Sequence, residues 1–164
     1  MRKEISAGAV VFYYDHKNKI REYLLLNYLN KHWDFPKGHI EIHESPIETV
    51  IREIKEETNL KIKLIKGFEK RVSYNFKDKG EFVYKEVIFY LAKSNSKKVI
   101  LSDEHRGYVW LPYYDALKLI TFNKNILKAA ELFLRNKEKN QNKNKRENKM
   151  NSKTDYGQKI MENN

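Results

Sequence analysis

The chain has 164 residues, enough for one domain with a hydrophobic core and a tail, and 40% of them are hydrophobic. It contains no cysteine, which excludes disulfides, thiolate metal sites and cysteine nucleophiles. The apolar stretch at residues 7–14 is too short for a membrane span and shows no cleavage-site pattern, so we expect a soluble cytoplasmic protein without a membrane partner.

The chain is basic both in residues 1–136 and in residues 137–164. The formal net charge is +11, of which residues 137–164 contribute +4 and residues 1–136 contribute +7. Such a balance is typical of proteins that bind nucleic acid or small polyanions, and also of ordinary surfaces rich in solvated lysine. Charge alone therefore does not identify the partner.

Strand and turn patterns occupy the first forty residues. Buried-strand composition predicts strands at residues 5–14 and 22–29, and a polar turn at residues 15–19 joins them into a hairpin. A loop that contains proline and glycine follows at residues 32–39.

The clearest helix of the chain begins after Ser45. Ser45 is a typical N-cap, Pro46 suits the first helical position, and Glu48 completes a capping box. Asn59 favours the left-handed conformation that ends a helix. The apolar residues expected to form the core stripe of this helix are Ile47, Val50, Ile51 and Ile54.

The remaining elements follow in the order strands, helices, tail. Strands are predicted at residues 60–70, 71–76, 82–93 and 108–111, and helices at residues 113–121 and 125–135. After about Asn136 the chain is rich in Lys, Asn and Glu and has almost no apolar residues. Because such a stretch cannot bury enough surface to offset ordering, we expect a folded domain over residues 1–136 and a disordered basic tail over residues 137–164.

Three glutamates lie on one side of the helix after Ser45. Glu53, Glu56 and Glu57 stand at positions i, i+3 and i+4, where like charges repel. Alone, this pattern is most often a solvated acidic face. The alternative is that the three glutamates bind a divalent cation, because Mg²⁺ prefers oxygen ligands and binds through a few carboxylates together with substrate phosphates.

The surrounding residues resemble the signature of the Nudix hydrolases. Glu44 stands six residues after Gly38, and the run Arg-Glu-Ile-Lys-Glu-Glu-Thr-Asn-Leu occupies residues 52–60. All but one of the fixed residues of that signature are present at the right spacing, as are both hydrophobic positions. Asn59 replaces the closing glycine, and His43 stands where relatives often have glycine, but neither change removes a metal ligand.

This resemblance implies an α/β/α sandwich with a central mixed sheet and hydrolysis of a phosphoanhydride bond by a metal-activated water. The metal would be Mg²⁺, with Mn²⁺ as a substitute. The implied catalytic metal ligands are Glu53, Glu56, Glu57 and the carbonyl of Gly38, with Glu44 and Arg52 fixing their geometry.

A further acidic ligand or base is expected outside the helix. We prefer Glu104 to Glu86 as this additional catalytic and metal-binding residue, because the loop of Glu104 precedes the predicted strand at residues 108–111. The alternative for Glu104 is an ordinary position on a loop surface.

Flanking residues narrow the substrate. Residues 32–41, His-Trp-Asp-Phe-Pro-Lys-Gly-His-Ile-Glu, are similar to the Trp-x-x-Pro-Lys-Gly-His-x-Glu run of asymmetrical diadenosine tetraphosphate hydrolases. Residues 6–11, 101–105 and 110–111 also resemble that subfamily. The resemblance covers about residues 3–135 and implies cleavage of diadenosine tetraphosphate into ATP and AMP. The implied phosphate-binding residues are His32, Lys37, His39 and Lys85, and the adenine-stacking candidates are Tyr74 and Phe122.

Other interpretations stay open. The substrate could instead be the 5′ end of RNA or another nucleotide derivative. A protein of another class, a module that binds nucleotides or nucleic acid without catalysis, is also open, although the intact glutamates argue against it. The basic tail keeps contact with nucleic acid as a secondary expectation. For Lys85 the alternative is a lysine that guards an edge strand.

Overall fold

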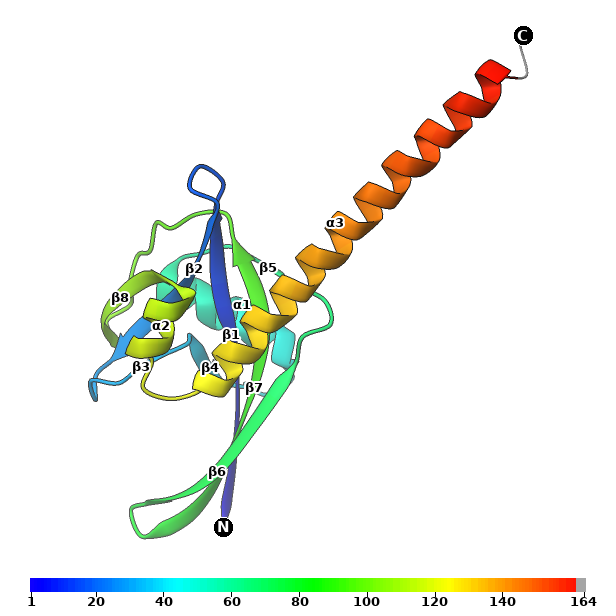
Figure 1. Ribbon diagram of the computed structural model, residues 1–164. Coiled ribbons are helices and arrows are strands. Elements are labelled where there is room, and N and C mark those ends of the chain that lie inside the picture. The colour runs from blue at the N-terminus through cyan, green and yellow to red at the C-terminus, as the bar shows by residue number, and fades with distance from the viewer. Residues whose placement is uncertain (162–164) are drawn as a thin grey trace. The chain divides into compact units, whose positions relative to one another are not determined.

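The computed structural model describes residues 1–161, which are built around an eight-stranded sheet (Figure 1). The strands are β1 (Arg2–Asp15), β2 (Ile20–Tyr28), β3 (Trp33–Asp34), β4 (Lys37–His39), β5 (Ile62–Leu64), β6 (Lys70–Asp78), β7 (Glu81–Ser94) and β8 (His105–Pro112). The helices within this range are α1 (Pro46–Thr58), α2 (Tyr113–Leu119) and α3 (Lys124–Met161). Helix α1 covers one face of the sheet, and α2 with the first turns of α3 covers the other, which confirms the predicted α/β/α sandwich.

The sheet is mixed, as predicted. Its strand order is β3-β2-β1-β7-β5, with β4 beside β1, β6 beside β7 and β8 beside β2. Strands β1 and β7 run parallel, whereas the other paired strands of residues 1–161 are antiparallel. Strand β1 pairs with β2 over residues 12–15 and with β4 over residues 6–8. This change of partner brings the segment before α1 against the first half of β1.

Gly8 permits this close approach of β4 to β1. A Cβ atom at Gly8 would lie 2.5 Å from both the Pro36 carbonyl oxygen and the Lys37 Cβ. Any side chain at this position would therefore push β4 away from β1. The glycine thus fixes the place of β4, which forms part of the pocket described below.

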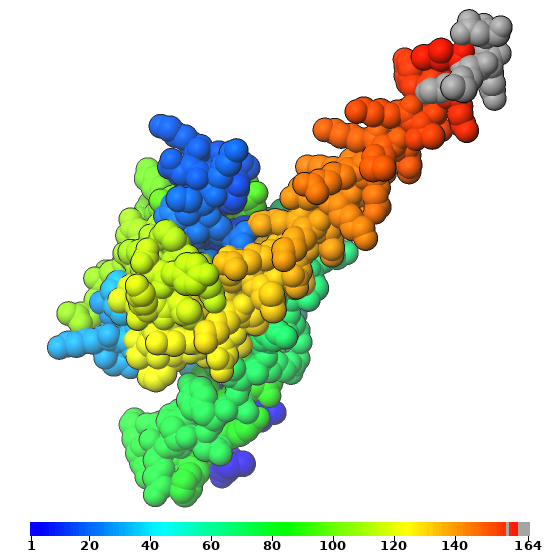
Figure 2. All heavy atoms as spheres, in the orientation of Figure 1, coloured from blue at the N-terminus to red at the C-terminus, as the bar shows by residue number. Residues whose placement is uncertain are grey.

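Strands β6 and β7 form a hairpin that projects from the sheet, with the first residues of β1 alongside it (Figure 2). Side chains alternate between the two faces of the hairpin. Tyr74 and Lys85 are paired in register and share one face, whereas Glu86, paired with Ser73, belongs to the other. The hairpin therefore presents Lys85 and Glu86 to opposite sides of the sheet.

The predicted caps of α1 are confirmed. The Ser45 hydroxyl accepts a hydrogen bond from the Glu48 amide at 3.2 Å, and the Glu48 carboxylate accepts one from the Ser45 amide at 2.7 Å. Asn59 has a φ of 59° and closes the helix through its amide, which donates to the Lys55 carbonyl at 2.9 Å. Because an N-cap of this kind stabilises a helix by about 1 kcal/mol, these local signals hold α1 in place.

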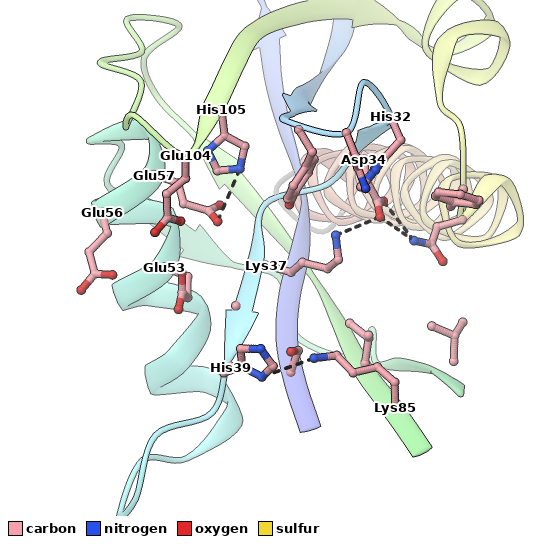
Figure 3. Close-up of a pocket in the computed structure, with 18 of the residues that line it drawn as sticks. His32, Asp34, Lys37, His39, Glu53, Glu56, Glu57, Lys85, Glu104 and His105 are labelled. Carbon is pink, nitrogen blue, oxygen red and sulfur yellow. Dashed lines mark hydrogen bonds and ion pairs between the residues drawn. The ribbon is translucent and has the colours of Figure 1, made fainter. Parts of the chain in front are cut away.

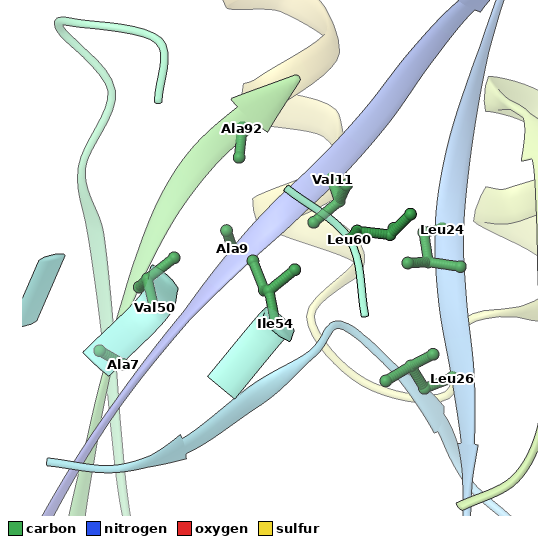
Figure 4. Close-up of a cluster of buried hydrophobic side chains, with 9 residues drawn as sticks. All are labelled: Ala7, Ala9, Val11, Leu24, Leu26, Val50, Ile54, Leu60 and Ala92. Carbon is green, nitrogen blue, oxygen red and sulfur yellow. The ribbon is translucent and has the colours of Figure 1, made fainter. Parts of the chain in front are cut away.

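The core between α1 and the sheet (Figure 4) contains fewer of the isoleucines of α1 than the sequence predicted. Its buried residues are Ala7, Ala9, Val11, Leu24, Leu26, Val50, Ile54, Leu60 and Ala92. Ile47 and Ile51 are 45% and 50% exposed, so their assignment to the core stripe was wrong. The reason is that α1 turns Glu57 and Thr58 toward the sheet together with Val50 and Ile54, which leaves the other two isoleucines at the edge of the buried stripe.

Two elements differ in length between the sequence prediction and the structure. The strand expected over residues 60–70 is limited to β5, because the chain turns after Leu64 and packs Phe68 into the core. The helix expected to end at residue 135 continues as α3 to Met161, where we expected disorder. Lys, Glu and Gln are good helix formers, and pairs such as Lys143 and Glu147, 3.9 Å apart at i and i+4, support a solvated helix.

The chain divides into two compact units, one from Met1 to Ala130 and a second that begins at Glu131. The side chains of residues 135–156 are all exposed. None of the helices within residues 1–161 combines the length and apolar character needed to cross a membrane.

Candidate active site

A pocket with a volume of about 970 Å³ collects nearly all the predicted site residues in the first unit (Figure 3). Those in its lining are His32, Lys37, Gly38, His39, Arg52, Glu53, Glu56, Glu57, Tyr74, Lys85, Glu104 and Phe122. They come from β4, α1, the β6–β7 hairpin and the loops before β3, β8 and α3. Glu44 is outside the lining but hydrogen-bonds to Arg52. Segments far apart in the sequence therefore converge on one pocket.

The three glutamates of α1 differ in exposure. The side chain of Glu57 is 4% exposed and that of Glu53 is 13% exposed, whereas that of Glu56 is 60% exposed. Figure 3 shows Glu56 pointing away from Lys37, toward the outer side of the helix. The helical spacing therefore places two carboxylates in the pocket and one at its rim.

Burial and mutual repulsion disfavour the ionised forms of the two buried carboxylates. Burial, then the neighbouring carboxylate of Glu53 and less strongly that of Glu104, raise the pKa of Glu57 to about 9 against the opposing charge of Lys37. Burial also raises the pKa of Glu53, although the Arg52 guanidinium opposes this shift. Among residues 1–161, Glu57 Oε2 has no hydrogen-bond partner, and neither has the buried Nε2 of His105, 3.7 Å from Glu57 Oε1. The acidic cluster is thus poised to accept a cation.

Arg52 organises the acidic cluster. Its Nε and Nη2 donate to the two carboxylate oxygens of Glu44 at 2.7 and 2.9 Å. Its Nη1 donates to Glu53 at 2.8 Å and to Glu56 at 3.2 Å. The hydrogen bonds from Arg52, and then that from Thr49, lower the pKa of Glu44 to about 2. Glu44 therefore stays ionised and anchors the guanidinium that orients Glu53.

Gly38 brings the backbone of β4 directly against α1. A Cβ atom at Gly38 would lie 1.9 Å from Glu53 Cδ and 2.0 Å from Glu53 Oε1. The position therefore holds a glycine because the Glu53 carboxylate occupies the space that a side chain would need.

The donor set fits a hard divalent cation. It consists of carboxylate oxygens, one of them an orphaned oxygen of Glu57, beside the glycine backbone of β4. No three His, Asp or Glu side chains in the described part of the chain already form a metal cage by themselves. Mg²⁺ does not require such a cage, because it keeps several waters and combines one or two carboxylates with substrate phosphates.

The two candidates for the additional acid occupy different sites. Glu104 lines the pocket, where its charge acts on the pKa of both Glu53 and Glu57. Glu86 lies outside the lining and pairs with Arg71 Nη1 at 3.3 Å. The pocket lining therefore favours Glu104 over Glu86 as the additional acid.

Lys85 is not an edge lysine. Strand β7 lies between β1 and β6 at this position, and Lys85 is 8% exposed. Its Nζ lies 3.2 Å from Glu4 Oε2 and 3.3 Å from His39 Nδ1. Burial lowers the pKa of Lys85 while Glu4 opposes this, and burial and Lys85 together lower the pKa of His39. Lys85 and His39 thus form one polar group at the pocket wall.

Aromatic rings line the part of the pocket around His32. His32 stacks on Tyr28 with ring centroids 4.7 Å apart and meets Phe122 edge-on at 5.4 Å. Tyr74 and Phe122 are 51% and 56% exposed, so their rings are open to a ligand. In Figure 3 the labelled glutamates gather on one side of the pocket, and His32, Lys37 and Lys85 lie on the other.

Sequence reasoning missed several lining residues, of which Tyr28, Asp34, His105 and Asn123 make the most contacts. Asp34 and His105 stand inside the runs that resemble the diadenosine tetraphosphate hydrolases, but that resemblance does not assign them a role. Tyr28 and Asn123 carry no signal in the sequence, because their contribution depends on contacts between distant segments.

Known proteins share the sequence pattern and the fold of this chain. The NUDIX domain profile matches residues 5–133. The asymmetrical bis(5′-nucleosyl)-tetraphosphatase of Sus scrofa is 37% identical over 126 residues, which cover 71% of this chain and 83% of that protein. The protein of the same name from Caenorhabditis elegans is 33% identical over 138 residues, covering 79% and 96%. The crystal structure of a C. elegans Ap4A hydrolase binary complex superposes with a TM-score of 0.72 at 30% identity, covering 81% and 98%.

The fold and the carboxylate pocket define a phosphoanhydride hydrolase, and the profile match spans most of the chain. The chain belongs to the Nudix hydrolase family. Within that family it is similar to the asymmetrical bis(5′-nucleosyl)-tetraphosphatases, which confirms the predicted family, fold class and enzymatic nature.

Proposed function

We propose that the protein is a Mg²⁺-dependent hydrolase that cleaves diadenosine tetraphosphate into ATP and AMP, with Mn²⁺ able to replace Mg²⁺. The observation that carries this proposal is the division of the pocket into an acidic side and a side with cations and aromatic rings. A dinucleoside polyphosphate needs both, because its phosphates require cations along their length and its base requires an apolar surface.

Glu53, Glu56, Glu57, Glu104 and the carbonyl of Gly38 would hold the metal. Bound there, Mg²⁺ supplies Lewis-acid activation of water and neutralises charge on the leaving phosphate. Arg52 keeps Glu53 and Glu56 in position through the hydrogen bonds at 2.8 and 3.2 Å, and Glu44 keeps Arg52 in position. Replacing any of these side chains would alter the geometry of the acidic side.

The other side of the pocket binds and orients the substrate. Lys37 and Lys85 attract the polyphosphate as point charges, and His32 and His39 add hydrogen-bonding nitrogens. Tyr74 and Phe122 stack on one adenine. Because the acidic cluster occupies one end of this arrangement, hydrolysis takes place toward one end of the polyphosphate and produces two unequal nucleotides.

A substrate panel tests this proposal. Purified protein is incubated with Mg²⁺ and, separately, diadenosine tetraphosphate, a nucleotide sugar and 5′-triphosphorylated RNA, and kcat/KM is compared. We expect diadenosine tetraphosphate to exceed the others by at least about tenfold and EDTA to abolish turnover. A higher kcat/KM for RNA would instead assign the protein to 5′-end RNA hydrolysis. Binding of all three without turnover would indicate a module without catalysis.

A further inference from the structure

The buried carboxylate of Asp34 lies at the junction between the polyphosphate side of the pocket and its aromatic wall. Asp34 is 2% exposed and belongs to the pocket lining. Its Oδ2 accepts from Lys37 Nζ at 3.0 Å, and its Oδ1 accepts from the Phe35 amide at 2.8 Å. The Asn123 side-chain amide lies 2.9 Å from Oδ1 and 3.1 Å from Oδ2. Two of these donors, Lys37 and Asn123, belong to the pocket lining, and the third is the backbone amide of the next residue in the chain.

These contacts fix Lys37 in one position. Its Nζ is held between Asp34 and the face of the Tyr28 ring, whose centroid is 4.2 Å away. A lysine side chain otherwise has many rotamers, and holding one of them costs conformational entropy. The ion pair with Asp34 supplies that restraint before any substrate is bound.

The same carboxylate fastens the loop that carries Phe122. Asn123 adopts a positive φ of 65°, a left-handed conformation that asparagine tolerates better than most residues, and its side chain bonds to Asp34. On the other side of Phe122, the Thr121 hydroxyl accepts from the Trp33 amide at 2.8 Å and the Thr121 amide donates to the Trp33 carbonyl at 2.9 Å. Phe122 is thus fastened to β3 through both of its neighbours, with its own ring left exposed.

We propose that Asp34 is a positioning residue that holds Lys37 and the Phe122 loop as one rigid unit, so that the phosphates and the base of a nucleoside polyphosphate are recognised together. This inference rests on the proposed function, because it assumes that the pocket takes such a nucleotide. It adds a specificity determinant on β3 to the residues that the resemblance implied. Asp34 acts through its two partners and takes no part in the reaction itself.

Steady-state kinetics test this role. Asp34→Asn keeps the size of the side chain but removes the charge that holds Lys37 and weakens the acceptor for Asn123. With diadenosine tetraphosphate and Mg²⁺, we expect KM to rise at least about tenfold while kcat changes less than about threefold, because the metal side of the pocket is untouched. Asp115→Asn, an exposed aspartate on α2, is the matched control and should change neither constant.

A fluorescence titration separates positioning from a general structural effect. Etheno-ATP, a fluorescent analogue of one expected product, is quenched when its base stacks on an aromatic ring. Wild-type protein and Asp115→Asn should quench it, and Asp34→Asn and Phe122→Ala should both lose the quenching. Asn123→Ala should weaken the quenching. Asp34→Asn should cause a smaller further loss of quenching in the Asn123→Ala background than it causes in the wild type, because both substitutions disrupt the same hydrogen bond.

The outcomes are distinct. Unchanged KM and quenching in Asp34→Asn, or a fall confined to kcat, would overturn the positioning role. If Asp34→Asn lowers the melting temperature strongly, the quenching by Asn123→Ala tests the positioning role instead. That variant breaks the contact with the loop and leaves the ion pair between Asp34 and Lys37 intact. If wild-type protein fails to cleave diadenosine tetraphosphate but quenches etheno-ATP, the proposed substrate is wrong and the titration still tests Asp34. If wild-type protein does not quench etheno-ATP, the positioning role inferred for Asp34 is wrong.

Discussion

At the residue scale, Glu57 is where burial and charge conflict most. Its carboxyl group is almost fully enclosed, has one oxygen without a partner and lies near two other carboxylates. A buried carboxylate in such surroundings is neutral unless a cation compensates it. The same features that destabilise the ionised residue therefore prepare it for a metal.

Glu57 should make the stability of the metal-free protein depend on pH. Its pKa of about 9 in the folded state lies above the ordinary value of 4.5, so the folded protein holds a proton that the unfolded chain releases between those values. In EDTA, the melting temperature should therefore fall as pH rises from about 6 to about 9. Added Mg²⁺ should raise it more at the higher pH, since the metal binds the ionised form.

The variant Glu57→Gln should remove this pH dependence, whereas Glu86→Gln, which changes a glutamate outside the pocket, should keep it. A melting temperature in EDTA with the same slope against pH in wild type and Glu57→Gln would show that Glu57 is not the titrating group.

Glu104 and Glu86 provide a second test at this scale. Glu104→Ala should lower the Mg²⁺-dependent kcat by at least about tenfold, because it removes a carboxylate beside Glu53 and Glu57. Glu86→Ala should change kcat by less than about twofold, since its partner Arg71 is outside the pocket lining. The measurement is initial rate against Mg²⁺ concentration for both variants. A normal Glu104→Ala beside an inactive Glu86→Ala would reverse the assignment.

At the element scale, the sequence predicted best where local signals decide the structure. The helix α1 follows from its capping box and its left-handed end, and the β1–β2 hairpin follows from buried-strand composition and a polar turn. The length of β5 did not follow, because it depends on where β7 offers a partner. The length of α3 did not follow either, because helix propensity without apolar residues gives no sign of where a helix ends.

The candidate site shows the same limit. The glutamates of α1 were predictable because their spacing is local. Asp34 and Asn123 were not, because the bond between them joins residues 89 positions apart. Ile51 was wrongly placed in the core because helical spacing alone does not show how far the sheet reaches around α1.

Gly38 tests the contact between β4 and α1. Gly38→Ala should displace the Glu53 carboxylate, since the new Cβ atom would overlap it, and activity should fall at least about tenfold. The melting temperature should change little, because the displaced atoms are the end of a flexible side chain. Gly107→Ala on β8 is the matched control, because its added Cβ would have no heavy atom within 4 Å among the described residues other than those of Gly107 and its two chain neighbours. Equal activity of the two variants would contradict the role given to Gly38.

At the scale of the whole molecule, the residues of the pocket all belong to the unit from Met1 to Ala130. The exposed part of α3 carries a net positive charge but none of the pocket residues. We therefore expect the first unit to carry out the chemistry and the basic segment to contribute only long-range attraction of a polyanion.

Removal of residues 137–164 tests this division. We expect kcat on diadenosine tetraphosphate to remain unchanged. Any increase in KM should shrink as salt rises, because exposed cations attract anions only over about a Debye length. Loss of turnover at saturating substrate would place part of the active site in the removed segment. Loss of a salt-sensitive affinity for RNA with intact turnover would identify the segment as a separate nucleic-acid contact.

The central claim is tested most directly by the products of diadenosine tetraphosphate in Mg²⁺, measured by chromatography for wild type and Glu56→Gln side by side. The account predicts ATP and AMP in equal amounts from wild type. It predicts a rate at least about a hundredfold lower for Glu56→Gln, with an unchanged melting temperature, because this rim carboxylate is lost as a metal ligand while the buried core of α1 is untouched. Two molecules of ADP as the main product, or near wild-type turnover by Glu56→Gln, would contradict it.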